Sequence, residues 1–381
     1  MPGPVVHPLK ALAAETVSPE EFDALLARAQ AGERPRAYIG FEPSGTAHVG
    51  WMVCAKTVQE MVAAGFDVTI LLADWHAYIN DKLGGDLKAI RRCADYMVDV
   101  FESLGIGRDT VTYRFAEEFA ADKDYWELVI RVAKSTTLAR IRRAMDILGR
   151  SEDEADKDVS KFLYPAMQVA DIFHLGVDLA YGGLDQRHAH MLARDVAKKL
   201  GRTPPVALHT ALVPNLKGGA GRMDPLEAAP RPELSGHGQP SKAATAFEAK
   251  MSKSDPSSGI FLHDTAGEVE EKMRKAHCPA RETDDNPVLD LVRLVIVPRL
   301  AGLHDDGPPR FEIKRPAKFG GNKIYLGYEA LEAEFKSGAL HPMDLKSGAA
   351  AALNRLLGPV RAYFAKRPDD LDFVQGLKRT R

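Results

Sequence analysis

Cysteine is scarce in this chain, which contains only three, Cys54, Cys93 and Cys278. Their wide spacing matches neither a metal-binding pattern nor the disulfide framework of small secreted domains. We therefore expect reduced thiols, a cytoplasmic location and no metal ion held by the protein itself. The neighbouring His188 and His190 have no third candidate ligand, which also argues against a metal site.

Long apolar runs are missing too, because no stretch approaches the roughly 18 residues that a membrane-spanning helix needs. The segment Met1–Lys10 has no apolar core of a secretion signal, so we expect no membrane partner. Neither sign of charge dominates, since 51 basic side chains balance 53 acidic ones. A local excess of Lys and Arg after Phe311 suits a phosphate backbone or an ordinary solvated tail equally well.

Strand-like and helix-like patterns alternate along the first part of the chain. The short β-prone segment 37–41 is followed by apolar residues at helical spacing, and 68–72 is a continuous apolar run. Such a run is typical of a strand buried on both faces. The alternation predicts an α/β fold, a Rossmann-like doubly wound parallel sheet with helices on both faces.

The composition changes along the chain and suggests three parts. Residues 1–36 are a lead-in with one helix, 37–255 form the Rossmann-like domain, and 256–381 form a mainly helical C-terminal domain. Within the second part we expect connective helices between positions 120 and 165, including a helical stretch around Tyr125–Leu148. Gly, Pro, Ala and Ser dominate 215–247, which predicts a flexible insertion.

The segment Pro43–Trp51 lies between a predicted strand and a predicted helix. Gly45 and Gly50 allow close approach of the backbone, and His48 can donate to a phosphate oxygen. The N–H groups at the start of the helix also favour phosphate. Taken alone, an ordinary strand-to-helix turn with a surface histidine explains these residues equally well.

A second motif is Lys250-Met251-Ser252-Lys253-Ser254, where two lysines flank small hydroxyl residues. A loop of this kind can close over a triphosphate and neutralise the charge that builds on leaving pyrophosphate. By itself it is typical of solvated surface. The order of a His-x-Gly turn followed much later by this pentapeptide resembles the paired ATP motifs of class I aminoacyl-tRNA synthetases.

Two further segments carry polar side chains in unusual places. Tyr164, Gln168 and Asp171 fall at i, i+4 and i+7, so they share one face of an otherwise apolar helix. Such a stripe is costly unless it faces water or a ligand, and a surface helix would normally show Lys or Glu, which favours a ligand wall. After Gly182-Gly183, Asp185 suits ribose hydroxyls and Gln186 an amino-acid carboxylate, although a plain glycine-rich turn explains that segment alone.

Together, the segments 37–51, 70–78, 164–194 and 341–346 resemble the tyrosyl-tRNA synthetases of the archaeal and eukaryotic type. The resemblance implies a tyrosine–tRNA ligase that activates L-tyrosine with ATP to tyrosyl-adenylate and transfers it to tRNA(Tyr). It also implies a C-terminal anticodon-binding domain, a homodimer formed through the helices near 125–165, and Mg²⁺ carried on the ATP phosphates rather than in a protein cage.

The resemblance further implies three sets of site residues. The first binds tyrosine, with the phenol read by the first two named: Tyr38, Asp171, His76, Tyr164, Gln168 and Gln186. The second binds ATP: Gly45, His48, Gly50, Asp185 and Lys253. Catalytic roles are implied for His48, Lys250 and Lys253. The third binds tRNA, the acceptor end through Arg143 and Arg187 and the anticodon through Phe319, His341 and Asp344.

Two alternatives remain open. One is tryptophanyl-tRNA synthetase, which shares the fold and motif order, although an indole N–H does not need Tyr38 with Asp171. The other is a catalytically weak paralogue that acts as an RNA-binding protein. Trp51 favours that alternative, since most members of the family have a second histidine there, whereas the intact Lys250–Ser254 motif opposes it.

Overall fold

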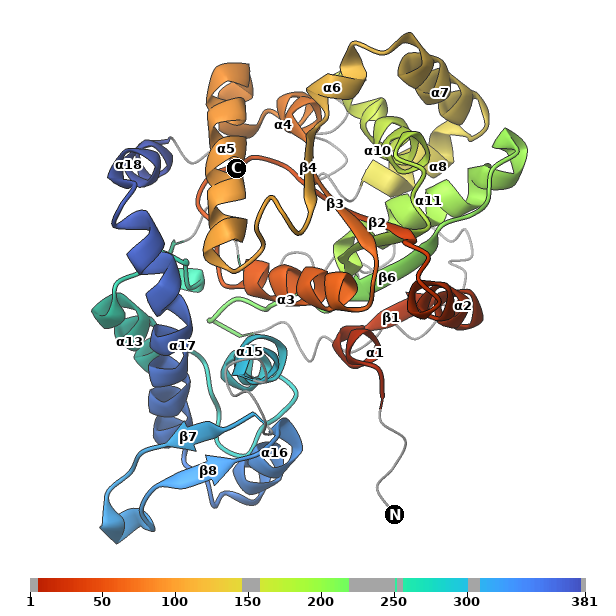
Figure 1. Ribbon diagram of the computed structural model, residues 1–381. Coiled ribbons are helices and arrows are strands. Elements are labelled where there is room, and N and C mark those ends of the chain that lie inside the picture. Colours follow the sequence, from red (N-terminus) through yellow and green to blue (C-terminus); the bar gives the residue numbers. More distant parts are fainter. Residues whose placement is uncertain (1–5, 146–157, 219–250, 252–255, 301–308, 378–381) are drawn as a thin grey trace. The chain divides into compact units, whose positions relative to one another are not determined.

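The computed structural model describes residues 6–145, 158–218, 251, 256–300 and 309–377. Its contacts divide the chain into two compact units, whose elements are labelled in Figure 1. Unit 1 comprises Met1–Gly45, Thr57–Thr210 and Leu377–Arg381, and unit 2 comprises Thr46–Lys56 and Ala211–Gly376. The expected functional division of the chain at 255 stays a prediction.

Unit 1 is built on a six-stranded sheet with the order β1-β6-β5-β2-β3-β4. The strands are β1 (Glu15–Val17), β2 (Arg36–Phe41), β3 (Asp67–Leu72), β4 (Thr112–Phe115), β5 (Leu179–Gly183) and β6 (Val206–Thr210). Neighbouring strands are parallel, except that β1 pairs with β6 in the antiparallel direction. The α/β fold with a doubly wound sheet is confirmed, with an antiparallel edge strand added.

Helices cover both faces of this sheet, as crossover connections between parallel strands require. The principal ones are the part of α3 (Gly50–Ala63) from Thr57 onward, α4 (Asp74–Ile79), α5 (Leu87–Ser103), α10 (Tyr164–His174) and α11 (Arg187–Ala197). Helix α5 lies on one face, and α10 and α11 lie on the other (Figure 1). The apolar side chains that flank the polar stripe of α10, such as Val169, Ala170 and Ile172, are fully buried against the sheet.

Further elements complete unit 1. They are α1 (Pro8–Leu12), α2 (Pro19–Gln30), η1 (Lys82–Gly85), α6 (Glu117–Ala120), α7 (Lys123–Lys134), α8 (Leu138–Ala144), η3 (Val159–Phe162), η4 (Leu184–Gln186) and η5 (Lys198–Leu200). The helical stretch expected around 125–148 is divided into α7 and α8. The Thr137 side chain accepts a hydrogen bond from Arg140 N and so caps a new helix. Leu148 lies outside the described residues.

Unit 2 is mainly helical after position 255. Its elements are η6 (Pro256–Ser258), α13 (Ala266–Lys275), α14 (Pro287–Leu291), the π-helical turn η7 (Val292–Ile296), α15 (Val297–Leu300), β7 (Phe311–Ile313), η8 (Ala317–Phe319), β8 (Lys323–Tyr325), α16 (Tyr328–Ser337), α17 (Pro342–Phe364) and α18 (Pro368–Gly376). The antiparallel β7–β8 hairpin was not expected from the sequence. Most of the predicted insertion, 219–247, lies outside the described residues.

Candidate active site

The first set of predicted site residues lies in unit 1, on elements that meet at the carboxyl ends of the parallel strands. Tyr38 belongs to β2, His76 to α4 and Gln186 to η4, while the remaining three follow one another along α10. In open α/β sheets, ligands bind beyond the carboxyl ends of the strands. The structure brings these side chains together, as the contacts below show.

Asp171 lies at the centre of the group, and only 1% of the residue is exposed. The Tyr125 hydroxyl donates to its Oδ1 at 2.8 Å. His76 Nε2 lies 3.2 Å from Oδ2, but the two atoms are not aligned for a hydrogen bond, so Oδ2 has no hydrogen-bonding partner among the described residues. A buried acceptor without a donor is costly, and the hydroxyl of a bound molecule would satisfy it.

The two glutamines form a second polar contact in the same group. Gln168 Nε2 donates to Gln186 Oε1 at 3.0 Å, while Gln168 Oε1 has no hydrogen-bonding partner among the described residues. A Cβ on Gly182 would lie 2.8 Å from Cβ and Cγ of Gln186, so glycine at this position leaves space for the Gln186 side chain. The ring of Tyr164 meets that of His76 edge to face, with centroids 4.8 Å apart.

Burial sets the charge state of this pocket. It raises the pKa of Asp171 to about 8, against the opposing hydrogen bond from Tyr125 and with a further contribution from the charge of Asp74. Burial also lowers the pKa of His76 to about 4. Together with the charge of Asp171, burial raises the pKa of Tyr38, while a hydrogen bond with Gln168 opposes the rise. These shifts favour the uncharged form of all three side chains, and the phenol of Tyr38 keeps its proton at neutral pH.

Sequence reasoning missed two members of the group, Tyr125 and Glu42. Burial and the charge of Glu42, which also forms a hydrogen bond with Tyr164, raise the pKa of the Tyr164 phenol. Asn80 Nδ2 donates to both carboxylate oxygens of Glu42, at 3.0 and 3.1 Å. Glu42 follows β2 directly, which is a signal that could have identified it, whereas the contact of Tyr125 depends on the packing of α7 against α10.

The second set of predicted residues is divided between the units. Gly45 and Asp185 belong to unit 1, and His48 and Gly50 to unit 2. Gly45 has φ +110°, a conformation that L side chains rarely adopt. Gly50 N donates to His48 Nδ1 at 3.1 Å, and a Cβ on Gly50 would lie 2.7 Å from His48 Cε1.

That contact has a chemical consequence for His48. Its Nδ1 accepts a backbone N–H, so the neutral imidazole carries its hydrogen on Nε2, the atom suited to donate to a phosphate oxygen. Trp51, which favoured a weak paralogue, is buried in unit 2, and its backbone N–H donates to the His48 carbonyl oxygen at 3.0 Å. Lys250 and Lys253 lie outside the described residues.

The third set comprises arginines in unit 1 and a cluster in unit 2. Arg143 is exposed on α8, and Arg187 begins α11. In unit 2, Phe319 is 59% exposed at the end of η8, within the β7–β8 connection. His341 caps α17, since its Nδ1 accepts from Met343 N at 3.2 Å. Asp344 follows in the first turn of that helix.

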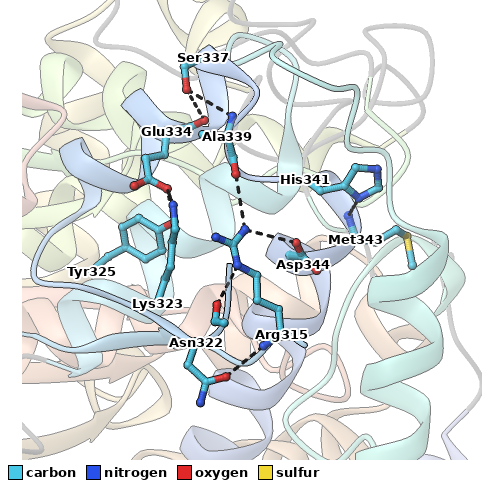
Figure 2. Close-up of polar contacts among 11 residues, drawn as sticks. Arg315, Asn322, Lys323, Tyr325, Glu334, Ser337, Ala339, His341, Met343 and Asp344 are labelled. Carbon is cyan, nitrogen blue, oxygen red and sulfur yellow. Dashed lines mark hydrogen bonds and ion pairs between the residues drawn. The ribbon is translucent and has the colours of Figure 1, made fainter. Parts of the chain in front are cut away.

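Arg315 connects the β7–β8 hairpin to α17 (Figure 2). Its Nε donates to the carbonyl oxygen of Gly321 at 2.9 Å, and its backbone N–H donates to Asn322 Oδ1 at 3.2 Å. Arg315 Nη1 reaches the carbonyl oxygen of Ala339 at 3.5 Å and lies 3.8 Å from Asp344 Oδ2. These contacts hold Asp344 beside the hairpin connection.

Neither a metal site nor a membrane span is found in the part of the chain that the structure describes. Across the described ranges, no three His, Cys, Asp or Glu side chains are grouped so that they could hold a metal ion. Within the same ranges, no helix combines the length and apolar character needed to cross a bilayer.

Comparison with known proteins decides the family. The model of class I tRNA synthetases for tryptophan and tyrosine (W and Y) matches residues 30–223 and 243–358. A tyrosine–tRNA ligase from Aeropyrum pernix is 47% identical over 347 residues, which cover 91% of this chain and 89% of the relative. The chain belongs to the tyrosyl-tRNA synthetase family.

Other relatives agree with this membership. A tyrosine–tRNA ligase from Saccharolobus solfataricus is 42% identical, covering 94% of this chain and 93% of the relative. The crystal structure of tyrosyl-tRNA synthetase from Pyrococcus horikoshii, in complex with L-tyrosine, is 37% identical with a TM-score of 0.82, covering 97% of this chain and 98% of that one. The predicted family and the predicted tyrosine–tRNA ligase activity are confirmed, and the tryptophan alternative is not favoured.

Proposed function

We propose that the unpaired Oδ2 of Asp171 receives the phenol hydroxyl of substrate tyrosine, with Tyr38 as its partner across the ligand. The observation that carries this proposal is a buried carboxyl oxygen with no donor of its own, in a pocket of uncharged aromatic groups. A pocket built to hydrogen-bond a hydroxyl leaves polar groups unpaired when phenylalanine enters, and it thereby rejects phenylalanine.

The opposite end of the ligand meets the other polar side chains of α10 and η4. Gln168 Oε1, which has no partner among the described residues, suits the substrate ammonium group. Tyr164 and Glu42, which interact with each other, add a hydroxyl and a negative charge. Gln168 donates a hydrogen bond to Gln186, and the missing Cβ of Gly182 leaves room for the Gln186 side chain. The Gln186 amide can therefore orient the substrate carboxylate. His76 packs against Tyr164 and closes the pocket wall.

ATP is the second substrate of class I synthetases. A carboxylate oxygen of tyrosine attacks the α-phosphorus of ATP, the bond to the bridging oxygen breaks, and pyrophosphate leaves with the electron pair. We assign His48 Nε2 to a phosphate oxygen, the Gly45–Gly50 turn to close approach of the nucleotide, and Asp185 to the ribose hydroxyls. Lys250 and Lys253 neutralise charge on the leaving group, and Mg²⁺ travels on the phosphates.

The transfer step needs the acceptor end of tRNA(Tyr). A hydroxyl of its terminal ribose attacks the carbonyl carbon of tyrosyl-adenylate, and AMP leaves. We assign Arg143 and Arg187 to the acceptor end, because guanidinium groups suit both phosphates and guanine edges. The exposed aromatic ring of Phe319 and the ring of His341 can stack on an unpaired anticodon base, while Asp344 accepts from its N–H groups.

A homodimer is supported by exposed apolar side chains on the connective helices. The side chains of Trp126, Ile130, Leu138, Val159 and Leu163 are between 39% and 82% exposed. Exposed apolar groups gathered on consecutive elements are typical of association surfaces. The expected cytoplasmic location stays a prediction.

The direct test is ATP–pyrophosphate exchange with each of the twenty amino acids, followed by charging of a transcript that bears the tyrosine anticodon. Exchange with tyrosine, weak exchange with phenylalanine and none with tryptophan are expected. Exchange with tryptophan alone would replace the proposed substrate. Failure to exchange with any amino acid, despite tRNA binding, would favour the RNA-binding paralogue.

A further inference from the structure

Glu15 is a charged residue of unit 1 to which no role has been assigned, although side chains from two other elements, β6 and α11, form a cluster with it. It lies on the edge strand β1 directly opposite His209 of β6 in the antiparallel register. Arg187 and His190 lie three residues apart on α11, and therefore on one face of that helix. The four side chains form a connected polar cluster.

Arg187 and Glu15 form the outer part of this cluster. Arg187 Nε donates to both carboxylate oxygens of Glu15, at 2.8 and 2.9 Å. The two terminal amino groups of the guanidinium take no part in these bonds. The Arg187 side chain is 30% exposed and that of Glu15 is 17% exposed, so solvent still reaches the pair. An arginine held through Nε alone keeps its planar fork of terminal N–H groups in one orientation.

Two buried histidines form the inner part of this cluster. His209 Nδ1 lies 2.8 Å from Glu15 Oε2, and His209 Nε2 lies 3.0 Å from His190 Nδ1. An ionised carboxylate only accepts, so His209 donates from Nδ1, and in its neutral form it accepts on Nε2 from His190. The bonds to His209 and Arg187 lower the pKa of Glu15 despite its burial, which keeps the carboxylate charged.

Glu15 is therefore held by the buried His209, and it in turn holds an arginine that solvent reaches. We infer that Glu15 is a positioning residue that orients Arg187 toward the acceptor end of tRNA. This inference rests on the proposed assignment of Arg187 to that end. The antiparallel strand β1 then has a functional purpose, since it delivers the carboxylate to the start of α11.

The sign of the effect separates positioning from simple charge. Removing a negative charge beside a tRNA-binding arginine would, by electrostatics alone, strengthen the binding of an anionic partner. If Glu15 orients Arg187, the same change weakens productive binding instead. Glu15→Gln retains the shape of the side chain, and Glu33→Gln is a matched control that removes one negative charge from the exposed Arg28–Glu33 pair in the same unit.

The experiment measures tyrosine-dependent pyrophosphate exchange and tRNA charging for the wild type, Glu15→Gln, Glu33→Gln, Arg187→Ala and the Glu15→Gln/Arg187→Ala double variant. We expect Glu15→Gln to lower kcat/KM for tRNA about ten-fold, with exchange within two-fold of wild type. The double variant should be no worse than Arg187→Ala, because both changes remove one interaction. Glu33→Gln should leave charging unchanged or slightly improved.

Each other result overturns the inference. Unchanged charging by Glu15→Gln, or a defect that adds fully to that of Arg187→Ala, would show that Glu15 does not act through Arg187, and the proposed function would stand. An equal loss of exchange and charging would show that the cluster supports the tyrosine pocket instead. Normal charging by Arg187→Ala would remove the assignment of Arg187 itself. If Glu15→Gln is poorly folded, Glu15→Asp takes its place, because it retains the negative charge. Glu15→Asp should then recover part of the charging rate that Glu15→Gln loses.

Discussion

Replacing Asp171 with asparagine isolates the atom on which recognition of tyrosine depends. The amide retains an oxygen that can accept from the Tyr125 hydroxyl, as Oδ1 does at 2.8 Å. Its NH₂ group takes the place of Oδ2, the buried oxygen without a donor. An NH₂ group cannot accept a phenol O–H, whereas Oδ2 of an ionised Asp171 can, so Asp171→Asn removes the hydrogen bond that the carboxylate makes to bound tyrosine and keeps the internal one.

The size of the effect follows from that single bond. Loss of a buried hydrogen bond costs about 1–3 kcal/mol, which corresponds to a loss of about 5- to 150-fold in kcat/KM for tyrosine. Phenylalanine makes no such bond, so its kcat/KM should stay within about three-fold of wild type. The ratio of the two values for tyrosine and phenylalanine therefore falls.

Pyrophosphate exchange with both amino acids measures this ratio. Asp178→Asn is the matched control, because Asp178 precedes β5 at the opposite end of the sheet and its Oδ2 accepts from Arg36 N at 2.8 Å. The control should leave the ratio unchanged. Equal losses for tyrosine and phenylalanine, or no loss for tyrosine, would refute the assignment of Oδ2 to the phenol.

Four further experiments test other parts of the account. Tyr125→Phe removes the only donor that the structure gives Asp171 Oδ1 among the described residues, so unfolding free energy should fall by about 1–2 kcal/mol in denaturant titrations, with weaker exchange. Asp171 has a pKa of about 8 in the folded protein, against 3.8 in the unfolded chain. Between pH 4 and 8 the unfolding free energy of the wild type should therefore fall, relative to that of Asp171→Asn, as pH rises. A constant difference between the two unfolding free energies would contradict this. Ile130→Glu places a charge on the exposed apolar surface of α7 and should yield monomers by sedimentation if that surface forms the dimer. Arg315→Met frees Asp344 from its ion pair and should lower kcat/KM for tRNA several-fold while exchange stays normal, whereas loss of exchange would point to misfolding.

The sequence was sufficient for part of the central sheet, because β2 and β3 are short β-prone or apolar runs that alternate with residues at helical spacing. The run 68–72 is β3, and the helix with Tyr164, Gln168 and Asp171 on one face is α10. Strands β1 and β6 were missed. β1 has only three residues of half-buried character, so neither an apolar run nor clear alternation marks it, and its pairing with β6 is set by tertiary contacts.

The pocket was predictable only in part, for a related reason. Gln186, which follows Gly182 and Gly183 at the end of β5, carries a local signal in a glycine-rich turn, whereas Tyr38 lies inside β2 and was identified only through the family resemblance. Tyr125 carries none, because its contact with Asp171 joins positions 46 residues apart through the packing of two helices. The β7–β8 hairpin was missed for a similar reason, because nine residues separate its strands. Arg315 meets Asp344 only through packing against α17.

A structure of the protein with bound L-tyrosine tests the central claim most directly. The distance to be measured joins the phenol oxygen of the ligand to Asp171 Oδ2. The account predicts a hydrogen bond of about 2.5–3.0 Å with the tyrosine ring between β2 and α10. A ligand whose phenol oxygen lies beyond hydrogen-bonding distance, with Oδ2 still unpaired, would contradict it.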